Sequence, residues 1–108
     1  MDKTKDKIDE YIDIIRKVID IDTVIIFGSF LNPGFNAENS DIDILIVSND
    51  FKNMSKLDAY KIVSDPLWDL KINIDPIPVS KDEIRNHDSA SFISEIIRTG
   101  KVFYKKTA

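Results

Sequence analysis

The spacing of hydrophobic residues along the chain predicts an alternation of helices and strands. Near the start, apolar residues recur every three to four positions, which is typical of an amphipathic helix. Short runs rich in Ile and Val follow, and such runs are typical of buried strands. The pattern predicts helices at about residues 4–20, 55–65 and 89–99, a short helix from residue 80, and strands at 23–27, 41–47, 70–79 and 102–104. We therefore expect an α/β or α+β layer architecture.

Turn and cap residues mark the ends of several of these elements. Ser80 and Glu83 have the spacing of a capping box, which begins a short helix. Gly100 follows the last helix, where a glycine in the left-handed conformation commonly ends a helix. Pro76 and Pro78 cannot donate ladder hydrogen bonds, so the strand that holds them is expected at an edge of the sheet, or frayed there.

Length, composition and charge narrow the classes of protein that the chain can represent. A chain of 108 residues, 43% hydrophobic and 31% charged, predicts one globular domain over residues 1–108. No apolar run approaches the roughly 20 residues that span a bilayer, and the acidic start lacks the apolar segment of a secretory signal. With no cysteine, disulfides and thiolate zinc sites are excluded, and we expect a cytoplasmic protein. The net charge of −4 disfavours a nucleic-acid partner, and no membrane partner is expected.

Two aspartates stand at the start of the strand predicted at 41–47. Side chains alternate across a strand, so Asp41 and Asp43 project to one side while the isoleucines between and after them face the other. Two neighbouring carboxylates on a hydrophobic sheet cost free energy unless a cation compensates them. Mg²⁺ prefers such oxygen ligands, and Asp75, in the run LKINIDPIPV, is the best candidate for a third carboxylate. Taken alone, Asp75 would be interpreted as an exposed residue of an edge strand.

A phosphate-binding turn is predicted directly after the first strand. Gly28 allows the backbone to approach a ligand closely. A short helical turn beginning at Ser29 would direct N–H groups and a hydroxyl toward an anion. The Gly-Ser pair alone would be an ordinary turn, but together with the aspartates of the next strand it predicts one shared cleft.

Three segments, GSF…SDIDILIV, INIDPIPV and FISEIIRTGKVFY, resemble the minimal nucleotidyltransferases of the DNA polymerase β-like superfamily. The resemblance extends over nearly the whole chain. Its signature is a strand ending in Gly-Ser, a polar gap, an Asp-hydrophobic-Asp strand and an acidic residue on a later strand. The resemblance implies a small mixed β-sheet with flanking helices, in the polymerase β-like nucleotidyltransferase fold.

The resemblance also implies an activity, a partner and a set of site residues. The activity is Mg²⁺-dependent transfer of an NMP group, AMP from ATP or the equivalent from another NTP, to a hydroxyl acceptor. Small relatives of this kind occur with helical HEPN-type proteins as antitoxin and toxin, so a HEPN-type protein is the favoured acceptor. The base, the true acceptor, a homo-oligomeric state and a count of one or two ions stay open. Catalysis and metal binding are assigned to Asp41, Asp43 and Asp75, and phosphate binding to Gly28, Ser29 and Ser40.

One departure from the family pattern supports a second hypothesis. Asn32 and Pro33 follow the Gly-Ser turn, where many minimal members have an Arg and continue a helix. Asn cannot replace the charge and the bidentate phosphate contact of Arg. The alternative is therefore a catalytically weak or inactive nucleotidyltransferase-like antitoxin that acts as a protein-binding module.

Other residues that could carry chemistry have simpler interpretations. His87 lies in a polar segment and is expected on the surface. Four aromatic residues are expected in the core and not in a base-stacking platform: Trp68, Phe92, Phe103 and Tyr104.

Overall fold

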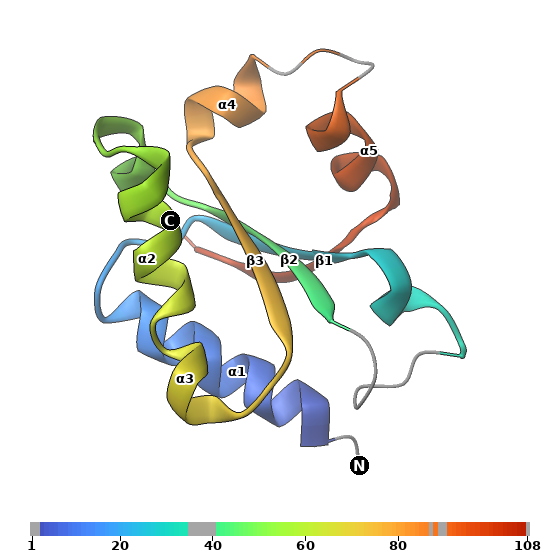
Figure 1. Ribbon diagram of the computed structural model, residues 1–108. Coiled ribbons are helices and arrows are strands. Elements are labelled where there is room, and N and C mark those ends of the chain that lie inside the picture. The colour runs from blue at the N-terminus through green and yellow to red at the C-terminus, as the bar shows by residue number, and fades with distance from the viewer. Residues whose placement is uncertain (1–2, 35–40, 87, 89–90, 108) are drawn as a thin grey trace.

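The computed structural model describes residues 3–34, 41–86, 88 and 91–107, which form a sheet with helices on both faces (Figure 1). The strands are β1 (Thr23–Phe27), β2 (Ile42–Val47), β3 (Ile74–Val79) and β4 (Lys101–Lys105). The helices are α1 (Lys3–Arg16), α2 (Lys56–Ser64), α3 (Leu67–Leu70), α4 (Lys81–Arg85) and α5 (Phe92–Thr99), with the short 3-10 turns η1 (Gly28–Leu31) and η2 (Asn49–Asn53). Among these residues, no helix is long and apolar enough to cross a membrane.

The strands lie in the order β3-β2-β1-β4 in one mixed sheet. β1 pairs antiparallel with both β2 and β4, whereas β3 runs parallel to β2. A parallel pair needs a crossover connection, which η2, α2 and α3 provide. The expected α/β architecture, the small mixed sheet and the edge position of the third strand are therefore confirmed.

The third strand starts later than the sequence predicts. It begins at Ile74 and not at residue 70, because the chain after Pro66 forms the additional short helix α3. Lys71 ends this helix in the left-handed conformation, with a φ of 53°. The alternation of apolar residues before Ile74 therefore belongs to a helix end and a turn. The strands β1 and β2 match their predicted ranges closely; β1 is a continuous apolar run, and β2 is apolar except for Asp43.

Each face of the sheet packs against its own helices. Even-numbered residues of β1, β2 and β3 face α1 and α2 in the larger core, which includes Ile8, Ile12, Ile15, Ile26, Ile42, Ile44 and Ile46. Odd-numbered residues face α4 and α5 in a smaller core, which includes Ile25, Phe27, Leu45, Val47, Val79 and Ile96. Asp43 and Asp75 have odd numbers, so their side chains belong to the face that the short helices cover.

Tyr11 links α1 to the crossover helix α2. Its ring is fully buried, and its hydroxyl donates a hydrogen bond to the carbonyl oxygen of Val63. Burial raises the pKa of the Tyr11 phenol well above its usual range. The neutral hydroxyl therefore stays a donor and fixes the two helices of the larger core against each other.

The two prolines of β3 face the outer edge of the sheet, where their missing N–H groups remove no hydrogen bond to β2. The Ser48 amide donates to the Val79 carbonyl at 3.0 Å. Backbone groups of successive residues point to opposite edges of a strand, so the odd-numbered residues of β3 face β2, while Pro76 and Pro78 face outward. At both prolines the outer edge offers a carbonyl oxygen but no N–H group.

The predicted capping box of α4 is confirmed, because Ser80 and Glu83 exchange side chain-to-backbone hydrogen bonds of 3.1 Å in both directions. Gly100 directly follows the end of α5, as predicted, but not in the left-handed conformation. Its backbone is extended, with a φ of −79°. An added Cβ at Gly100 would lie 2.6 Å from Ile25 Cγ2 and 2.6 Å from the carbonyl oxygen of Ile96. Glycine is required there because α5 turns closely onto β1, not because of a left-handed conformation.

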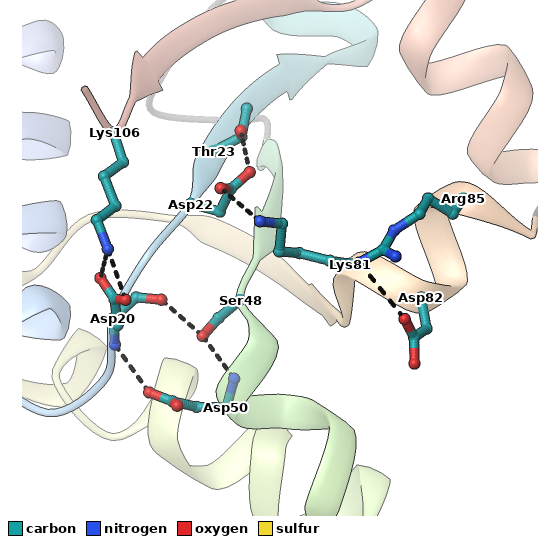
Figure 2. Close-up of polar contacts among 9 residues, drawn as sticks. All are labelled: Asp20, Asp22, Thr23, Ser48, Asp50, Lys81, Asp82, Arg85 and Lys106. Atoms are coloured by element: carbon teal, nitrogen blue, oxygen red, sulfur yellow. Dashed lines mark hydrogen bonds and ion pairs between the residues drawn. The ribbon is translucent and has the colours of Figure 1, made fainter. Parts of the chain in front are cut away.

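A polar network holds the chain together at the end of the sheet where β1 begins (Figure 2). Lys106 Nζ lies 2.8 Å from Asp20 Oδ2, and Lys81 Nζ lies 3.4 Å from Asp22 Oδ1. The buried Ser48 hydroxyl donates to the Asp20 carbonyl at 2.8 Å. These contacts fix the residues after β4 and the start of α4 against the connection between α1 and β1.

Two of the four aromatic residues expected in the core are on the surface. Trp68 is 85% exposed and Phe92 is 61% exposed, so the expectation is wrong for both. Phe103 and Tyr104 are partly buried against the larger core, as expected. Trp68 lies on α3, which the sequence pattern did not predict, and Phe92 opens α5.

Candidate active site

The structure places Asp43 of β2 and Asp75 of β3 side by side. They are register partners in the parallel pair, so both side chains project from the same face of the sheet. Asp41 directly precedes β2, two residues before Asp43. The sheet therefore pairs two of the three aspartates that the sequence nominates as metal ligands, and the third, Asp41, lies just before β2.

The charges of these aspartates act on one another. Asp43 is half-buried, whereas Asp41 and Asp75 are exposed. Desolvation by burial raises the pKa of the Asp43 carboxyl, and the negative charges of Asp75 and Asp41 raise it further. In the described residues, no lysine or arginine forms an ion pair with any of the three. Within the described part of the chain, this region of the sheet thus concentrates negative charge without a compensating ion pair.

Gly28 brings the end of β1 against Asp43. Its φ of +77° lies in the left-handed region, and an added Cβ would lie 2.5 Å from Asp43 Oδ2. Any other residue would be strained and would displace this carboxylate. Phe27, the residue before, is the register partner of Asp43. The Gly-Ser turn and the aspartates therefore share one corner of the molecule.

The turn after β1 is the short 3-10 helix η1, which begins at Gly28. The turn η1 closes with a hydrogen bond of 3.0 Å from the Asn32 amide to the Ser29 carbonyl. Asn32 itself is extended, with a ψ of 143°, because the following Pro33 disfavours a helical conformation there. The helix ends at Leu31, and the turn contains no cationic side chain.

Two residues named from the sequence, Ser40 and His87, lie outside the described residues. Their assignments, phosphate binding for Ser40 and a surface position for His87, stay predictions.

The three aspartates fit a hard, oxygen-binding cation by their chemistry but are not gathered into a finished site. In the described part of the chain, no group of three or more His, Cys, Asp or Glu side chains could hold a metal ion as it stands. The backbone register still makes Asp43 and Asp75 neighbours, and the exposed side chains of Asp41 and Asp75 have room to rotate. Uncompensated carboxylates are the donor set that Mg²⁺ prefers, so these residues fit that ion.

A pair of aromatic rings lies near the aspartates and was not predicted from the sequence. Phe92 packs edge to face on Phe27, with ring centroids 5.7 Å apart and an interplanar angle of 80°. Phe27 in turn neighbours Asp43 across the sheet. The sequence of α5 does not single out Phe92, because it shares the apolar face of the helix with three isoleucines: Ile93, Ile96 and Ile97.

Comparisons with known proteins agree with this arrangement. A family model described as polymerase beta, nucleotidyltransferase matches residues 9–108. A Fibrobacter succinogenes protein named as a probable cyclic nucleotide phosphodiesterase is 28% identical over 91 residues, which are 83% of this chain and 34% of that protein. The chain therefore spans about a third of the length of this curated relative.

Solved structures with low sequence identity share the fold. A candidate nucleotidyltransferase from Sulfolobus solfataricus has a TM-score of 0.71 at 23% identity, covering 96% of this chain and 82% of that one. The complex of the tri-AMPylated Shewanella oneidensis HEPN toxin with an MNT antitoxin contains a chain with a TM-score of 0.63 at 16% identity, covering 95% and 73%. A toxin–antitoxin complex named MntA–HpeT contains a chain with a TM-score of 0.62 at 16% identity, covering 91% and 72%.

The family match agrees with three features of the structure: the fold, the Gly-Ser turn and the paired aspartates. The family model spans all four strands of the described sheet and all but the first turns of α1. The chain belongs to the polymerase beta nucleotidyltransferase family.

Proposed function

We propose that the protein is a Mg²⁺-dependent nucleotidyltransferase that moves an NMP group, AMP from ATP, onto a hydroxyl acceptor. The observation that carries the proposal is the register pairing of Asp43 with Asp75, next to a glycine whose backbone lies against the Asp43 carboxylate. Membership of the nucleotidyltransferase family supports the reaction class.

The order of the strands suggests a role for each residue. The Gly28–Ser29 turn after β1 would bind the β- and γ-phosphates through backbone N–H groups and the serine hydroxyl. Asp41, Asp43 and Asp75 would hold Mg²⁺, which when bound neutralises phosphate charge and polarises the reacting oxygens. Asp75 lies on β3, two strands away from the turn after β1, and this position supports a role as the acceptor of the proton of the attacking hydroxyl.

The transfer is a single displacement at the α-phosphorus of the nucleotide. The acceptor oxygen forms a bond to this atom, while the bond to the bridging oxygen of the β-phosphate breaks. Pyrophosphate leaves with the electron pair, and the proton of the acceptor hydroxyl passes to the Asp75 carboxylate. Positioning and electrostatic stabilisation supply the rate enhancement, without a covalent enzyme intermediate.

A HEPN-type protein is the acceptor that we propose. One solved structure similar to this chain is named for an AMPylated HEPN toxin with its MNT antitoxin, and another for a toxin–antitoxin pair. The named variant of the second structure carries two Asp-to-Glu changes two positions apart, which is the spacing of Asp41 and Asp43 here. These names support a functional Asp-x-Asp pair and a protein acceptor.

The composition of η1 supports a second candidate function, a weakly active or inactive antitoxin that binds its partner without modifying it. No lysine or arginine occurs from Gly28 to Gly34, and the helix that would support a longer phosphate contact ends at Leu31. Without a guanidinium group the turn would hold a triphosphate less tightly. A protein-binding role does not depend on that affinity.

Isothermal titration with ATP and Mg²⁺ tests the proposed site. The wild type should bind ATP-Mg²⁺, and the double variant Asp41→Asn with Asp43→Asn should lose binding, because Asn keeps the side-chain shape but removes the charge. Asp69→Asn, at an exposed position of α3, is the matched control and should bind as the wild type does. Equal binding by the folded double variant and the wild type would refute the metal site.

Labelled ATP separates the two candidate functions once a HEPN-type protein is added. Transfer of label to that protein, abolished by Asp43→Asn, would support the enzyme. A tight complex without any transfer would support the binding module and refute the transferase.

A further inference from the structure

A groove of about 570 Å³ lies along the outer edge of β3, beside the candidate active site. Figure 1 shows β3 between α2 on one side and the α4–α5 layer on the other. Side chains from all of these elements line the groove, chiefly Tyr60, Ile77, Val79, Phe92 and Ile93. An apolar groove of this volume is in the range of natural ligand-binding sites.

The three aspartates do not line the groove, but two relations in the sheet bring the groove near them. Ile77 follows Asp75 by two residues, so both side chains lie on the same face of β3. Phe92, at the rim of the groove, packs on Phe27, which is the register partner of Asp43. A molecule seated in the groove would therefore have one end near Asp75 and Asp43.

We infer that this groove is the acceptor-binding subsite, and that it takes a polypeptide segment with apolar side chains beside the reacting hydroxyl. The inference rests on the proposed nucleotidyltransferase function. In a displacement at phosphorus, the attacking oxygen and the leaving group lie on opposite sides of the reacting atom. Pyrophosphate leaves toward the turn after β1, across β2 from β3. The acceptor therefore approaches from the β3 side, where the groove lies.

The lining of the groove selects the class of acceptor. Tyr60 is 48% exposed and Phe92 is 61% exposed, above an aliphatic floor. The charged residues of the lining, Lys56 and Glu83, form an ion pair of 2.6 Å and leave no net charge. A nucleic acid would need uncompensated cations, and a polycationic sugar would need uncompensated carboxylates. An apolar peptide segment needs neither, and its burial against two aromatic rings is favourable.

The edge of β3 determines how the segment binds. Pro76 and Pro78 present no outward N–H groups, so the segment cannot complete a strand ladder there. Side-chain contacts must supply the affinity instead. Tyr60 and Phe92 are thus specificity-determining residues for the acceptor. Trp68 lies in a separate hollow with Leu67 and Ser64 and does not line the groove, although Tyr60 borders both.

Amide NMR spectra of the whole chain test the inference with three capped pentapeptides. Each has a central serine, flanked by phenylalanines, by glutamates or by lysines. The phenylalanine peptide should perturb the resonances of Tyr60, Ile77 and Phe92, and should bind about tenfold more tightly than the charged peptides, a difference equivalent to about 1.4 kcal/mol. Tyr60→Ser should weaken this binding by about tenfold, whereas the matched control Trp68→Ser should leave it unchanged.

Equal binding of the three peptides, perturbations centred elsewhere, or full binding by Tyr60→Ser would overturn the inference. A parallel titration with ATP and Mg²⁺ separates this failure from that of the proposed function. Nucleotide binding at Gly28 without peptide binding in the groove would refute the acceptor subsite alone. Absence of nucleotide binding would refute the transferase, and the acceptor role with it. With labelled ATP, Tyr60→Ser should raise the KM for the phenylalanine peptide about tenfold at unchanged kcat.

Discussion

Replacement of Gly28 by alanine should damage both the fold and the candidate site. The φ of this residue is +77°, and its position leaves a Cβ only 2.5 Å from Asp43 Oδ2. Two separate effects follow from one added methyl group. The backbone is strained because an L side chain disfavours the left-handed region, and the Asp43 carboxylate must turn away to relieve the contact.

The structure allows a magnitude for each effect. The left-handed backbone costs an alanine roughly 1–2 kcal/mol, and forcing the Asp43 side chain from its rotamer costs about 0.5–1.5 kcal/mol. Gly28→Ala should therefore lower the free energy of unfolding by roughly 1.5–3.5 kcal/mol. With a typical urea m-value of about 2 kcal/mol per M, the unfolding midpoint should fall by about 1–2 M.

Urea unfolding with two further variants separates the two effects. Gly34→Ala is the matched control, because a Cβ at Gly34 meets nothing within 4 Å and its φ is not positive. It should be neutral, or stabilising by up to about 1 kcal/mol. In an Asp43→Ala background the carboxylate contact is absent, so Gly28→Ala should cost only the backbone part, roughly 1–2 kcal/mol.

Two results would refute this reasoning. If Gly28→Ala lowered the free energy of unfolding no more than Gly34→Ala does, the left-handed turn would not be required. An equal cost in both Asp43 backgrounds would show that the glycine and the carboxylate do not touch. Titration of folded Gly28→Ala with ATP and Mg²⁺ adds a functional readout, because displacement of Asp43 should weaken binding.

The remaining predictions concern the site and the core. Asp43→Asn should be more stable than the wild type at pH 7. The pKa of Asp43 is raised, so the folded state binds a proton at this carboxyl more tightly than the unfolded state does. The stability that protonation gives the wild type is therefore lost as the pH rises through the pKa of the folded state. Urea curves at decreasing pH should show this difference shrinking, and a constant difference would contradict it. ATP should raise the melting temperature of the wild type in Mg²⁺ but not in excess EDTA, and the same increase in both would argue against metal dependence. Tyr11→Phe leaves the buried carbonyl oxygen of Val63 without its hydroxyl donor, and should lower the free energy of unfolding in urea by about 1–3 kcal/mol. Tyr60→Phe, at an exposed position, should leave the free energy of unfolding almost unchanged. Gly100→Ala should cost about 1–3 kcal/mol, because its Cβ would meet a backbone carbonyl that cannot move aside, and a neutral result would show that α5 shifts instead.

Local patterns predict the elements whose formation depends on nearby residues. Thr23–Phe27 is a strand in the sequence and in the structure because a continuous β-branched run has few alternatives. The Ser80 capping box is likewise formed by residues three positions apart. The same reasoning failed between Leu70 and Ile74, where alternating apolar residues suggested a strand and the chain forms the end of α3 and a turn. Periodicity over so few residues does not distinguish the two.

Non-local features of the site depend on tertiary contacts that a local pattern does not contain. The pairing of Asp43 with Asp75 follows from a parallel register across a crossover. The residue pattern nominated Asp75 as a third carboxylate but did not predict that register. Gly100 has the sequence signal of a helix end, but the approach of Ile25 determines its role. Phe92 is as apolar as its neighbours in α5, and the narrow helical layer leaves it exposed.

The prolines of β3 have a consequence for how accurately the candidate site is assembled. If β3 slipped by one residue against β2, the backbones of Pro76 and Pro78 would face β2, and two ladder hydrogen bonds would lose their donors. The same slip would turn Asp75 into the isoleucine-rich core beside α1 and α2, at the cost of burying an unpaired charge. A misaligned β3 is therefore less stable than the native register, both in its backbone hydrogen bonds and in its core. The correct alignment of Asp75 with Asp43 does not depend on a bound nucleotide.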